Sequence, residues 1–269
     1  MILWLTLSNP VFTDTHTHLY LEEFDADRDQ VVCRAEEAGV KYMFLPNIDS
    51  SSVEPMLALS RGWPGLCFPM IGLHPTSVRK NYLEELQTMR NYLADATYRF
   101  YGIGEIGTDL YWDKTFEKEQ KEGFCLQLDL AVEYKLPVAV HTRNSIEITL
   151  NIMEGRSGQG LRGVFHCFSG DVAQAARAVN MGFYLGIGGV ITYKKSGLAG
   201  VVAAMPLESL LLETDAPFLP PVPHRGQRNE SSYIPLIAAK IAEIKGVTLE
   251  EVAEVTTRNA MKLFKVAAR

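Results

Sequence analysis

Short apolar segments rich in β-branched and aromatic residues recur along the chain, roughly every thirty residues. We expect strands at residues 11–18, 40–47, 67–75, 100–107, 136–142, 163–169, 182–189 and 209–215. Segments with a helical pattern lie between most of them, at residues 25–38, 116–134 and 171–181. Near the end, isoleucines recur at helical spacing at positions 234, 237, 241 and 244. Thr248 and Glu251 then form a possible capping box, which predicts the start of a last helix.

Strands that alternate with helices predict a parallel sheet whose two faces are both covered, so the fold class is α/β. Eight units of roughly thirty residues account for most of the about 250 residues of a (β/α)8, or TIM, barrel. No linker rich in proline, glycine or serine divides the chain. We therefore expect a single barrel domain over residues 1–269.

An open, doubly wound α/β sheet is the competing architecture. It should carry a glycine-rich phosphate loop after its first strand, whereas the first strand here ends in His-Thr-His. The glycine cluster at residues 186–189 follows a late strand instead. It indicates a tight strand end rather than a phosphate-binding loop, and the barrel is favoured.

The charge balance limits the kind of partner. With 26 Lys and Arg against 32 Asp and Glu, the net charge is −6. A protein that wraps duplex DNA by bulk electrostatics is normally basic, so any nucleic-acid contact must be local. No apolar run approaches the roughly 20 residues of a membrane span. The apolar residues 1–7 lack the basic start and cleavage site of a secretion signal. We expect a cytoplasmic protein with no membrane contact and no obligate protein partner.

The cysteines support the same location. They are far apart, form no C-x-x-C pair, and occupy positions 33, 67, 125 and 167. We expect four reduced and mostly buried thiols in a cytosolic protein.

The histidines carry most of the chemical information. In the first predicted strand Asp14, His16 and His18 alternate, so the three side chains point to one face near the end of the strand. Two imidazoles and a carboxylate that point inward together would be costly to bury without a cation. The pattern therefore favours a metal site over its simpler alternative, a pair of hydrogen-bonded core histidines.

Four further candidates each lie at the end of a different predicted strand, namely Glu105, His141, His166 and Asp215. Each alone is also explained as a helix cap, a satisfied histidine or an ordinary strand-end aspartate. Barrel enzymes place their chemistry at the C-terminal ends of the strands, so together these residues predict one site. With His16 and His18 they suffice for two divalent ions. Glu105 is the natural bridge, because the fourth strand lies midway between the histidines of the first strand and the other two.

A series of motifs extends over essentially the whole chain. In order, they are FTDTHTHL, GLHP, GEIGTDLYWD, PVAVHTR, HCFSG, LLETDAPFL and PHRGQRNE. This series resembles the motifs of the TatD family of metal-dependent deoxyribonucleases. The resemblance implies an amidohydrolase-type barrel, a divalent-metal site and hydrolysis of DNA phosphodiesters. It also implies that the metal ligands are His16, His18, Glu105, His141, His166 and Asp215.

Such a ligand set predicts hydrolysis by a metal-activated water. Two ions about 3.5–4 Å apart can hold a water and lower its pKa toward roughly 7, so that the hydroxide attacks phosphorus in line. Glu105 and Asp215 are the catalytic candidates, Glu105 as the bridge and Asp215 as ligand and general base. Imidazole-rich coordination favours Zn²⁺, Mn²⁺, Fe²⁺ or Ni²⁺ over Mg²⁺. The resemblance implies Mg²⁺, with Mn²⁺ or Zn²⁺ as alternatives.

Substrate contacts are expected from polar side chains late on the strands or just beyond them. The candidates are His74, Arg143, His224, Arg225 and Arg228. Arginine suits bidentate recognition of phosphate, and a solvated loop charge is its simpler alternative. Aromatic residues that follow strand ends either stack an unpaired base or roof the barrel; they are Tyr20, Tyr111, Trp112 and Tyr193.

Together these features predict a metal-dependent deoxyribonuclease that acts like an exonuclease on single-stranded or frayed DNA ends. The alternative is a metallohydrolase of a small amide, lactone or phosphoester with the same two-metal site, because a fold alone does not fix the substrate. A non-catalytic binding protein would predict a broken ligand set, whereas all six positions are present.

Overall fold

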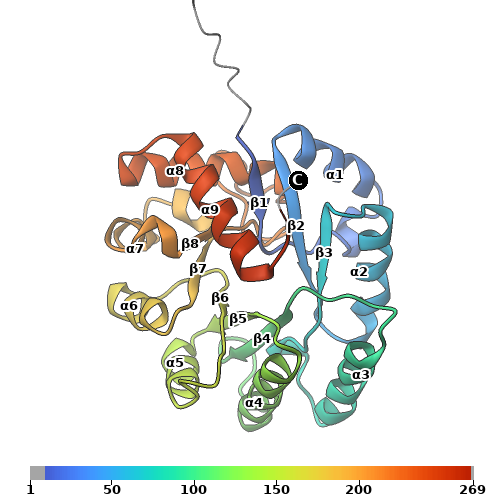
Figure 1. Ribbon diagram of the computed structural model, residues 1–269. Helices are drawn as coiled ribbons and strands as arrows, with labels where there is room; N and C mark the ends of the chain where they lie inside the picture. The colour runs from blue at the N-terminus through green and yellow to red at the C-terminus, as the bar shows by residue number, and fades with distance from the viewer. Residues whose placement is uncertain (1–9, 268–269) are drawn as a thin grey trace, which may run out of the picture.

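The structure is a computed structural model that describes residues 10–267, so the apolar residues 1–7 lie outside the described part. In that part strands and helices alternate (Figure 1). The strands are β1 (Phe12–Asp14), β2 (Val40–Pro46), β3 (Cys67–Met70), β4 (Ile103–Asp109), β5 (Val138–Arg143), β6 (Gly163–Phe165), β7 (Tyr184–Ile187) and β8 (Leu210–Leu212). Each overlaps one predicted strand segment. The α-helices are α1 (Arg28–Glu37), α2 (Ser50–Gly62), α3 (Tyr82–Ala94), α4 (Glu117–Tyr134), α5 (Ile146–Glu154), α6 (Val172–Asn180), α7 (Leu198–Ala204), α8 (Ile234–Lys245) and α9 (Leu249–Phe264).

The strands close into a parallel barrel. One sheet has the order β1-β2-β3 and the other the order β4-β5-β6-β7-β8, with every neighbouring pair parallel. Two isolated parallel bridges join the sheets, one between Ile71 and Ile103 and the other between Thr17 and Ala216. The predicted α/β TIM barrel is therefore confirmed, and the open doubly wound sheet is wrong.

The helices surround the barrel (Figure 1). The isoleucines predicted at helical spacing form one face of α8, and this face points to the core of the protein. Ile234, Ile237 and Ile241 are buried, and Ile244 packs against the same core. The α9 helix begins where predicted, and the Thr248 hydroxyl forms the N-cap half of the predicted capping box by accepting a hydrogen bond from the Glu251 amide. It packs against β1 and β8. Among residues 10–267, no helix is long and apolar enough to cross a membrane.

The first strand is shorter than predicted. β1 ends at Asp14, so His16 and His18 lie in the loop that follows it. Asp14 does not join the two histidines, because its buried carboxylate accepts hydrogen bonds from the hydroxyls of Thr214 and Ser231, at 2.6 and 2.7 Å. The carboxylate thus ties the first strand to the chain that follows β8, where the barrel closes.

The cysteines differ from the expectation in one respect. All four are free thiols, but Cys67 alone among them is buried, while Cys33 is exposed and Cys125 and Cys167 are half-buried. The prediction of mostly buried thiols is wrong because Cys33 and Cys125 lie on α1 and α4, outside the barrel. Cys167 directly follows His166 at the open end of the barrel, where it lines a cavity.

Candidate metal centre

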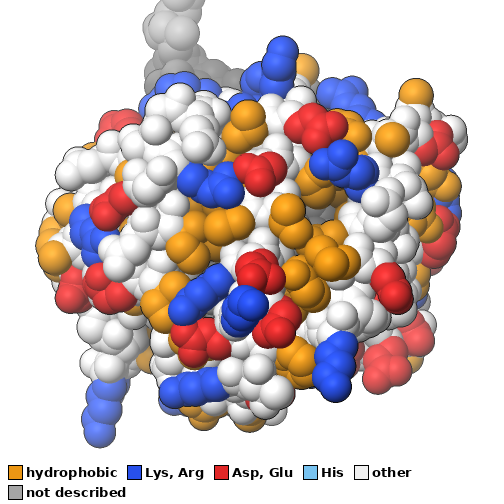
Figure 2. All heavy atoms as spheres, turned by 90° about the horizontal axis from the view of Figure 1, so that it is seen from below, with side chains coloured by type: hydrophobic (Ala, Val, Ile, Leu, Met, Phe, Trp, Pro, Cys, Tyr) orange, Lys and Arg blue, Asp and Glu red, His pale blue; other side chains and the backbone are white. Residues whose placement is uncertain are grey.

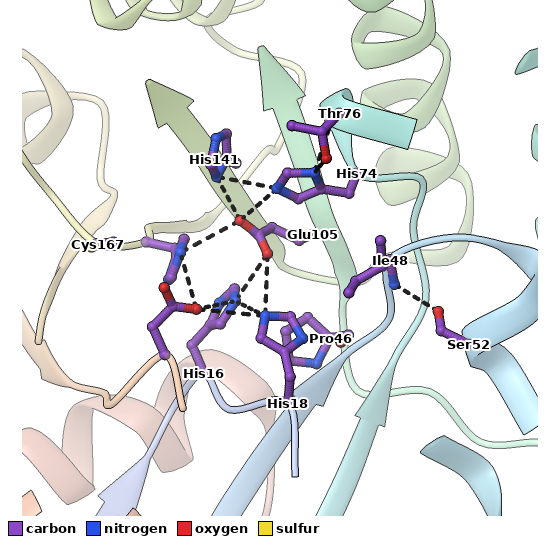
Figure 3. Close-up of polar contacts among 12 residues, drawn as sticks. His16, His18, Pro46, Ile48, Ser52, His74, Thr76, Glu105, His141 and Cys167 are labelled. Carbon is purple, nitrogen blue, oxygen red and sulfur yellow. Dashed lines mark hydrogen bonds and ion pairs between the residues drawn. The ribbon is translucent and has the colours of Figure 1, made fainter. Parts of the chain in front are cut away.

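The six predicted ligands meet at the C-terminal end of the barrel. Glu105 and His141 lie on β4 and β5, whereas the other four lie just beyond the ends of β1, β6 and β8. Figure 3 shows the Glu105 side chain among the imidazoles of His16, His18, His74 and His141. Parallel strands of a barrel end at the same rim, so each strand end contributes side chains to one place.

Glu105 lies between two groups of imidazoles. Its Oε2 atom is 3.1 Å from Nε2 of His16 and 3.5 Å from Nε2 of His18. Its Oε1 atom is 2.7 Å from Nδ1 of His141 and 3.4 Å from Nε2 of His166. The carboxylate therefore turns one oxygen toward each group, which is the arrangement that a bridging ligand requires.

Asp215 approaches the same imidazoles from the end of β8. Its Oδ1 atom lies 3.5 Å from Nε2 of His18, 3.8 Å from Nε2 of His16 and 3.9 Å from Nε2 of His166. The residue has a φ of +57°, a left-handed conformation that aspartate tolerates better than most residues. Donor atoms of His16, His166 and Asp215 lie close enough together to hold one ion, as do those of His16, His18 and Glu105.

Each of three histidines has a polar partner on the side away from Glu105. Nδ1 of His18 is 2.9 Å from the Tyr20 hydroxyl and 3.2 Å from the Pro46 carbonyl oxygen. The Tyr20 hydroxyl donates to that carbonyl at 2.6 Å, so both oxygens can accept from His18. This favours a proton on Nδ1 and leaves the Nε2 lone pair facing the carboxylates, as in a metal-binding histidine.

Carboxylates stand behind the other two histidines. Asp109 Oδ2 is 3.0 Å from Nε2 of His141, and Glu213 Oε1 is 3.0 Å from Nδ1 of His166. Glu213 also accepts the Cys167 amide at 2.6 Å. A carboxylate behind a ligating imidazole fixes the orientation and tautomer of the ring.

Two residues of the site, Asp109 and Glu213, were not predicted from the sequence. Asp109 lies two residues beyond the predicted end of its strand, and Glu213 was hidden beside the stronger candidate Asp215. One signal for Glu213 was present, because the glycine cluster makes room for it: a Cβ atom at Gly186 would overlap its carboxylate. The glycine cluster at residues 186–189 also marks a strand end as predicted, since β7 ends at Ile187.

His74 differs from the other histidines of the cluster. Its Nδ1 atom accepts a hydrogen bond from the Thr76 amide at 3.1 Å, which places the proton of a neutral ring on Nε2. That nitrogen lies 3.3 Å from Oε1 of Glu105. Burial lowers the pKa of His74, although Glu105 opposes this effect. His74 thus presents a hydrogen-bond donor to the site rather than a lone pair.

The ionisation of the cluster favours a cation. Burial alone would raise the pKa of Glu105, but the surrounding imidazoles of His74, His166 and His16 hold it well below its usual value. Burial would lower the pKa of His166, yet Glu213, Glu105 and Asp215 together raise it to about 10. Buried carboxylates thus draw positive charge onto neighbouring imidazoles. A divalent cation bound between these carboxylates would supply the same positive charge, and the imidazole and carboxylate donors present are suitable ligands for such an ion.

A cavity of about 670 Å³ opens onto this cluster. Of the predicted substrate contacts, His74 and Arg143 line it, whereas His224, Arg225 and Arg228 are not among the described residues that do so. The Arg228 guanidinium donates twice to the Asp27 carboxylate, both at 2.8 Å.

The remaining candidates pack against aromatic rings or orient a neighbour. The His224 ring stacks on Tyr233, with ring centres 4.0 Å apart, and the Arg225 guanidinium lies 4.4 Å from the centre of the Tyr193 ring. The Tyr193 hydroxyl donates a hydrogen bond to the Pro220 carbonyl oxygen, so Tyr193 holds the loop between β8 and α8 in place. Tyr20 is buried behind His18. Among the predicted stacking residues, Trp112 lines the cavity.

Comparison with known proteins agrees with this geometry. The chain matches the family model of TatD related DNases over residues 13–265. It is 36% identical to the uncharacterized metal-dependent hydrolase YabD of Bacillus subtilis, over 94% of this chain and 98% of that protein. The crystal structure of YjjV, a TatD homologue from Escherichia coli, superposes with a TM-score of 0.90 at 32% identity, covering 95% and 98% of the two chains. A 3′-5′ ssDNA/RNA exonuclease named TatD, from Pectobacterium parmentieri, is 29% identical over 94% of this chain and 99% of that protein.

Proposed function

Because this chain belongs to the TatD family of metal-dependent hydrolases, we propose that it is a deoxyribonuclease that acts from single-stranded or frayed DNA ends. The observation that supports the proposal most directly is the position of Glu105. Its two carboxylate oxygens face two separate groups of imidazoles, which suits a pair of ions rather than one. Paired ions are typical of enzymes that cleave phosphodiesters.

The residues of the cluster would divide between two divalent ions. His16, His18 and Asp215 would hold one ion together with Oε2 of Glu105. His141 and His166 would hold the other together with Oε1. When bound, such ions lower the pKa of water and neutralise the charge that develops on phosphate. The family resemblance favours Mg²⁺, whereas the imidazole-rich donor set favours Mn²⁺ or Zn²⁺.

Asp215 is the better placed of the two carboxylates to accept a proton. Both side chains line the cavity, but that of Asp215 is 14% exposed and that of Glu105 only 4% exposed. The pKa of Asp215 is lowered: burial would raise it, but His166 and His18 outweigh that effect. Asp215 therefore remains a carboxylate and can serve as the general base.

The phosphate can be oriented by two donors of the cavity wall. His74 presents its Nε2 proton beside Glu105, and Arg143 offers a guanidinium near the entrance. A guanidinium can bind two phosphate oxygens at once. These donors favour a phosphodiester over a neutral amide or lactone of similar size.

The test is an assay of metal-stripped protein supplied with Mg²⁺, Mn²⁺ or Zn²⁺. Single-stranded oligonucleotides labelled at the 3′ or the 5′ end are compared with a panel of amides, lactones and small phosphoesters. We expect stepwise shortening of the oligonucleotides, restored by at least one metal and abolished by chelation. Hydrolysis of a panel compound with intact oligonucleotides would favour the small-molecule alternative.

Glu105→Gln tests the bridge in the same assay. This variant keeps the shape of the side chain but removes its charge, so activity should be lost and the number of ions bound per chain should fall. Glu133→Gln is the matched control, because Glu133 is an exposed residue of α4 paired with Arg90. Normal turnover with a full complement of metal in Glu105→Gln would remove Glu105 from the site.

A further inference from the structure

Three large apolar side chains are exposed at the entrance of the cavity, and two of them are aromatic. Trp112 is 69% exposed and Phe218 is 47% exposed, and both line the cavity that contains the candidate ligands. In the view from below Figure 1, hydrophobic side chains gather around the middle of the face, with basic and acidic side chains between them (Figure 2). Apolar surface beside a functional cavity commonly marks the place of a ligand.

The Trp112 side of the entrance is a supported platform. Arg143 lies against both aromatic residues of the β4–α4 loop, its guanidinium carbon 4.0 Å from the centre of the Tyr111 ring and 5.0 Å from that of Trp112. The Tyr111 amide donates to Oδ1 of Asp109 at 3.0 Å. Since Oδ2 of the same carboxylate contacts His141, one side chain holds both the platform and a candidate ligand.

The Phe218 side is also tied to the cluster. The Phe218 ring lies edge-on to the His18 ring, with the ring centres 6.3 Å apart. Its amide donates to the Asp215 carbonyl oxygen at 2.8 Å, and its own carbonyl accepts from the Asn229 side chain at 2.6 Å. Phe218 therefore stands next to two candidate ligands, on a turn that hydrogen bonds hold in place.

We infer that this entrance is a subsite for an unpaired nucleobase, which packs against Trp112 and Phe218 while Arg143 contacts a neighbouring phosphate. The inference rests on the proposed function. A nucleobase is planar and has π faces that stack on aromatic rings whatever its identity. The adjacent guanidinium supplies the positive charge that a nucleotide requires and that a purely apolar ligand would not.

This subsite requires an unpaired end. In a duplex the faces of a terminal base are partly covered by its neighbour and its edge is paired, so the base can reach the platform only after the end frays. Stacking discriminates weakly among the four bases. The enzyme should therefore select unpaired ends over duplex ends with little preference for sequence.

The experiment compares two oligonucleotides that differ at one residue. One has an ordinary terminal nucleotide at the end from which the wild-type protein cleaves, and the other has a tetrahydrofuran residue there, which keeps the phosphate but lacks the base. We expect the missing base to raise KM for the wild-type protein about tenfold, which corresponds to about 1.4 kcal/mol, with a smaller change in kcat. In Trp112→Ala the two substrates should have similar KM values, and Trp112→Phe should restore much of the difference.

Leu83→Ala is the control, because Leu83 is a large side chain of α3 that is 57% exposed and lies outside the cavity lining. It should keep the wild-type difference between the two substrates. Oligonucleotide cleavage in which Trp112→Ala discriminates as the wild type does would overturn the subsite and leave the proposed function intact. A wild-type protein that cleaves no oligonucleotide would overturn the proposed function and, with it, the subsite.

Discussion

Asp109 Oδ2 lies 3.0 Å from Nε2 of His141, on the opposite edge of the ring from the Nδ1 atom that faces Glu105. The Asp109 side chain is almost fully buried, and its backbone lies in register with Arg143 of β5. The aspartate thus fixes which nitrogen of His141 points to the cluster. Asp109 contacts His141 on the edge of the ring away from Glu105, so it acts through His141 and we regard it as a positioning residue.

Asp109→Asn should weaken metal binding and catalysis together. The amide can still accept a hydrogen bond, but it no longer supplies the negative charge that supports the imidazole. We expect a loss of about tenfold in metal affinity or turnover, at the lower end of the usual range for such partners. Metal titration and steady-state kinetics measure the two effects. Asp113→Asn, in the same loop but exposed, should behave like the wild type.

Asp215→Asn should separate folding from chemistry. The variant should retain its fold and part of its metal, whereas turnover should fall by a factor of about 10² or more because an amide cannot accept a proton from water. Circular dichroism, metal analysis and initial rates report the three properties. A loss of activity of less than about tenfold, roughly 1.4 kcal/mol of barrier, would contradict the assignment of Asp215 as the base.

The salt dependence of binding should distinguish Arg143 from Arg228. The binding constant K for single-stranded DNA is measured on the Asp215→Asn variant at fixed metal concentration and increasing salt. The slope of log K against log salt concentration should be about −0.7 for each phosphate that the protein neutralises. Arg143→Ala should flatten this slope by up to about 0.7. Arg228→Ala should leave it almost unchanged, because Arg228 is paired with Asp27. If binding by the protein that keeps both arginines did not depend on salt, the result would favour a small-molecule substrate.

Glu230 should make stability depend on pH in the acid range. Burial would raise its pKa, but hydrogen bonds from Arg34 and Ser232 hold it below its usual value of 4.5. A lowered pKa stabilises the fold above pH 4.5, and this contribution is lost as the pH falls through the folded-state value. Glu230→Gln should therefore cost about 1 to 2 kcal/mol at pH 7 and much less near pH 3, measured by urea unfolding.

The control for Glu230 is Glu243→Gln, since Glu243 is an exposed residue of α8 that pairs with Lys240. Its replacement should change stability by less than about 0.5 kcal/mol at either pH. An equal effect of Glu230→Gln at both pH values would show that its charge does not stabilise the folded state.

The order of strands and helices followed from local patterns, because buried parallel strands are short apolar runs and the outer helices carry one apolar face. The gathering of His16, Glu105 and Asp215 also followed, since one rim collects the ends of all the strands. What could not be predicted was the direction of individual side chains. Asp14 alternates with His16 in sequence, yet it turns toward Thr214 because β1 ends there.

Partners that come from distant segments were equally hidden. Whether Arg228 is free or paired depends on Asp27, which lies two hundred positions earlier and meets it where the loop between β8 and α8 lies beside the start of α1. Asp109 lies behind His141 of the next strand, and Glu213 lies behind His166, which comes earlier in the chain, just after β6. Nothing in the immediate sequence of Asp109 or Glu213 reveals these contacts. Such contacts are set by barrel geometry rather than by spacing along the chain.

The closure of the barrel between its first and last strands also sets the order in which the cluster can form. His16 and His18 leave the ribosome about two hundred residues before Asp215 and the chain that pairs beside them. Until then β1 is paired with β2 but lacks its neighbour on the side where the barrel closes, and the imidazoles lack one carboxylate. Since contacts of long sequence separation form late in folding, the complete ligand set can appear only after residue 215 has been synthesised. A ribosome-bound fragment that ends before residue 215 should therefore contain barrel segments but not the complete ligand cluster.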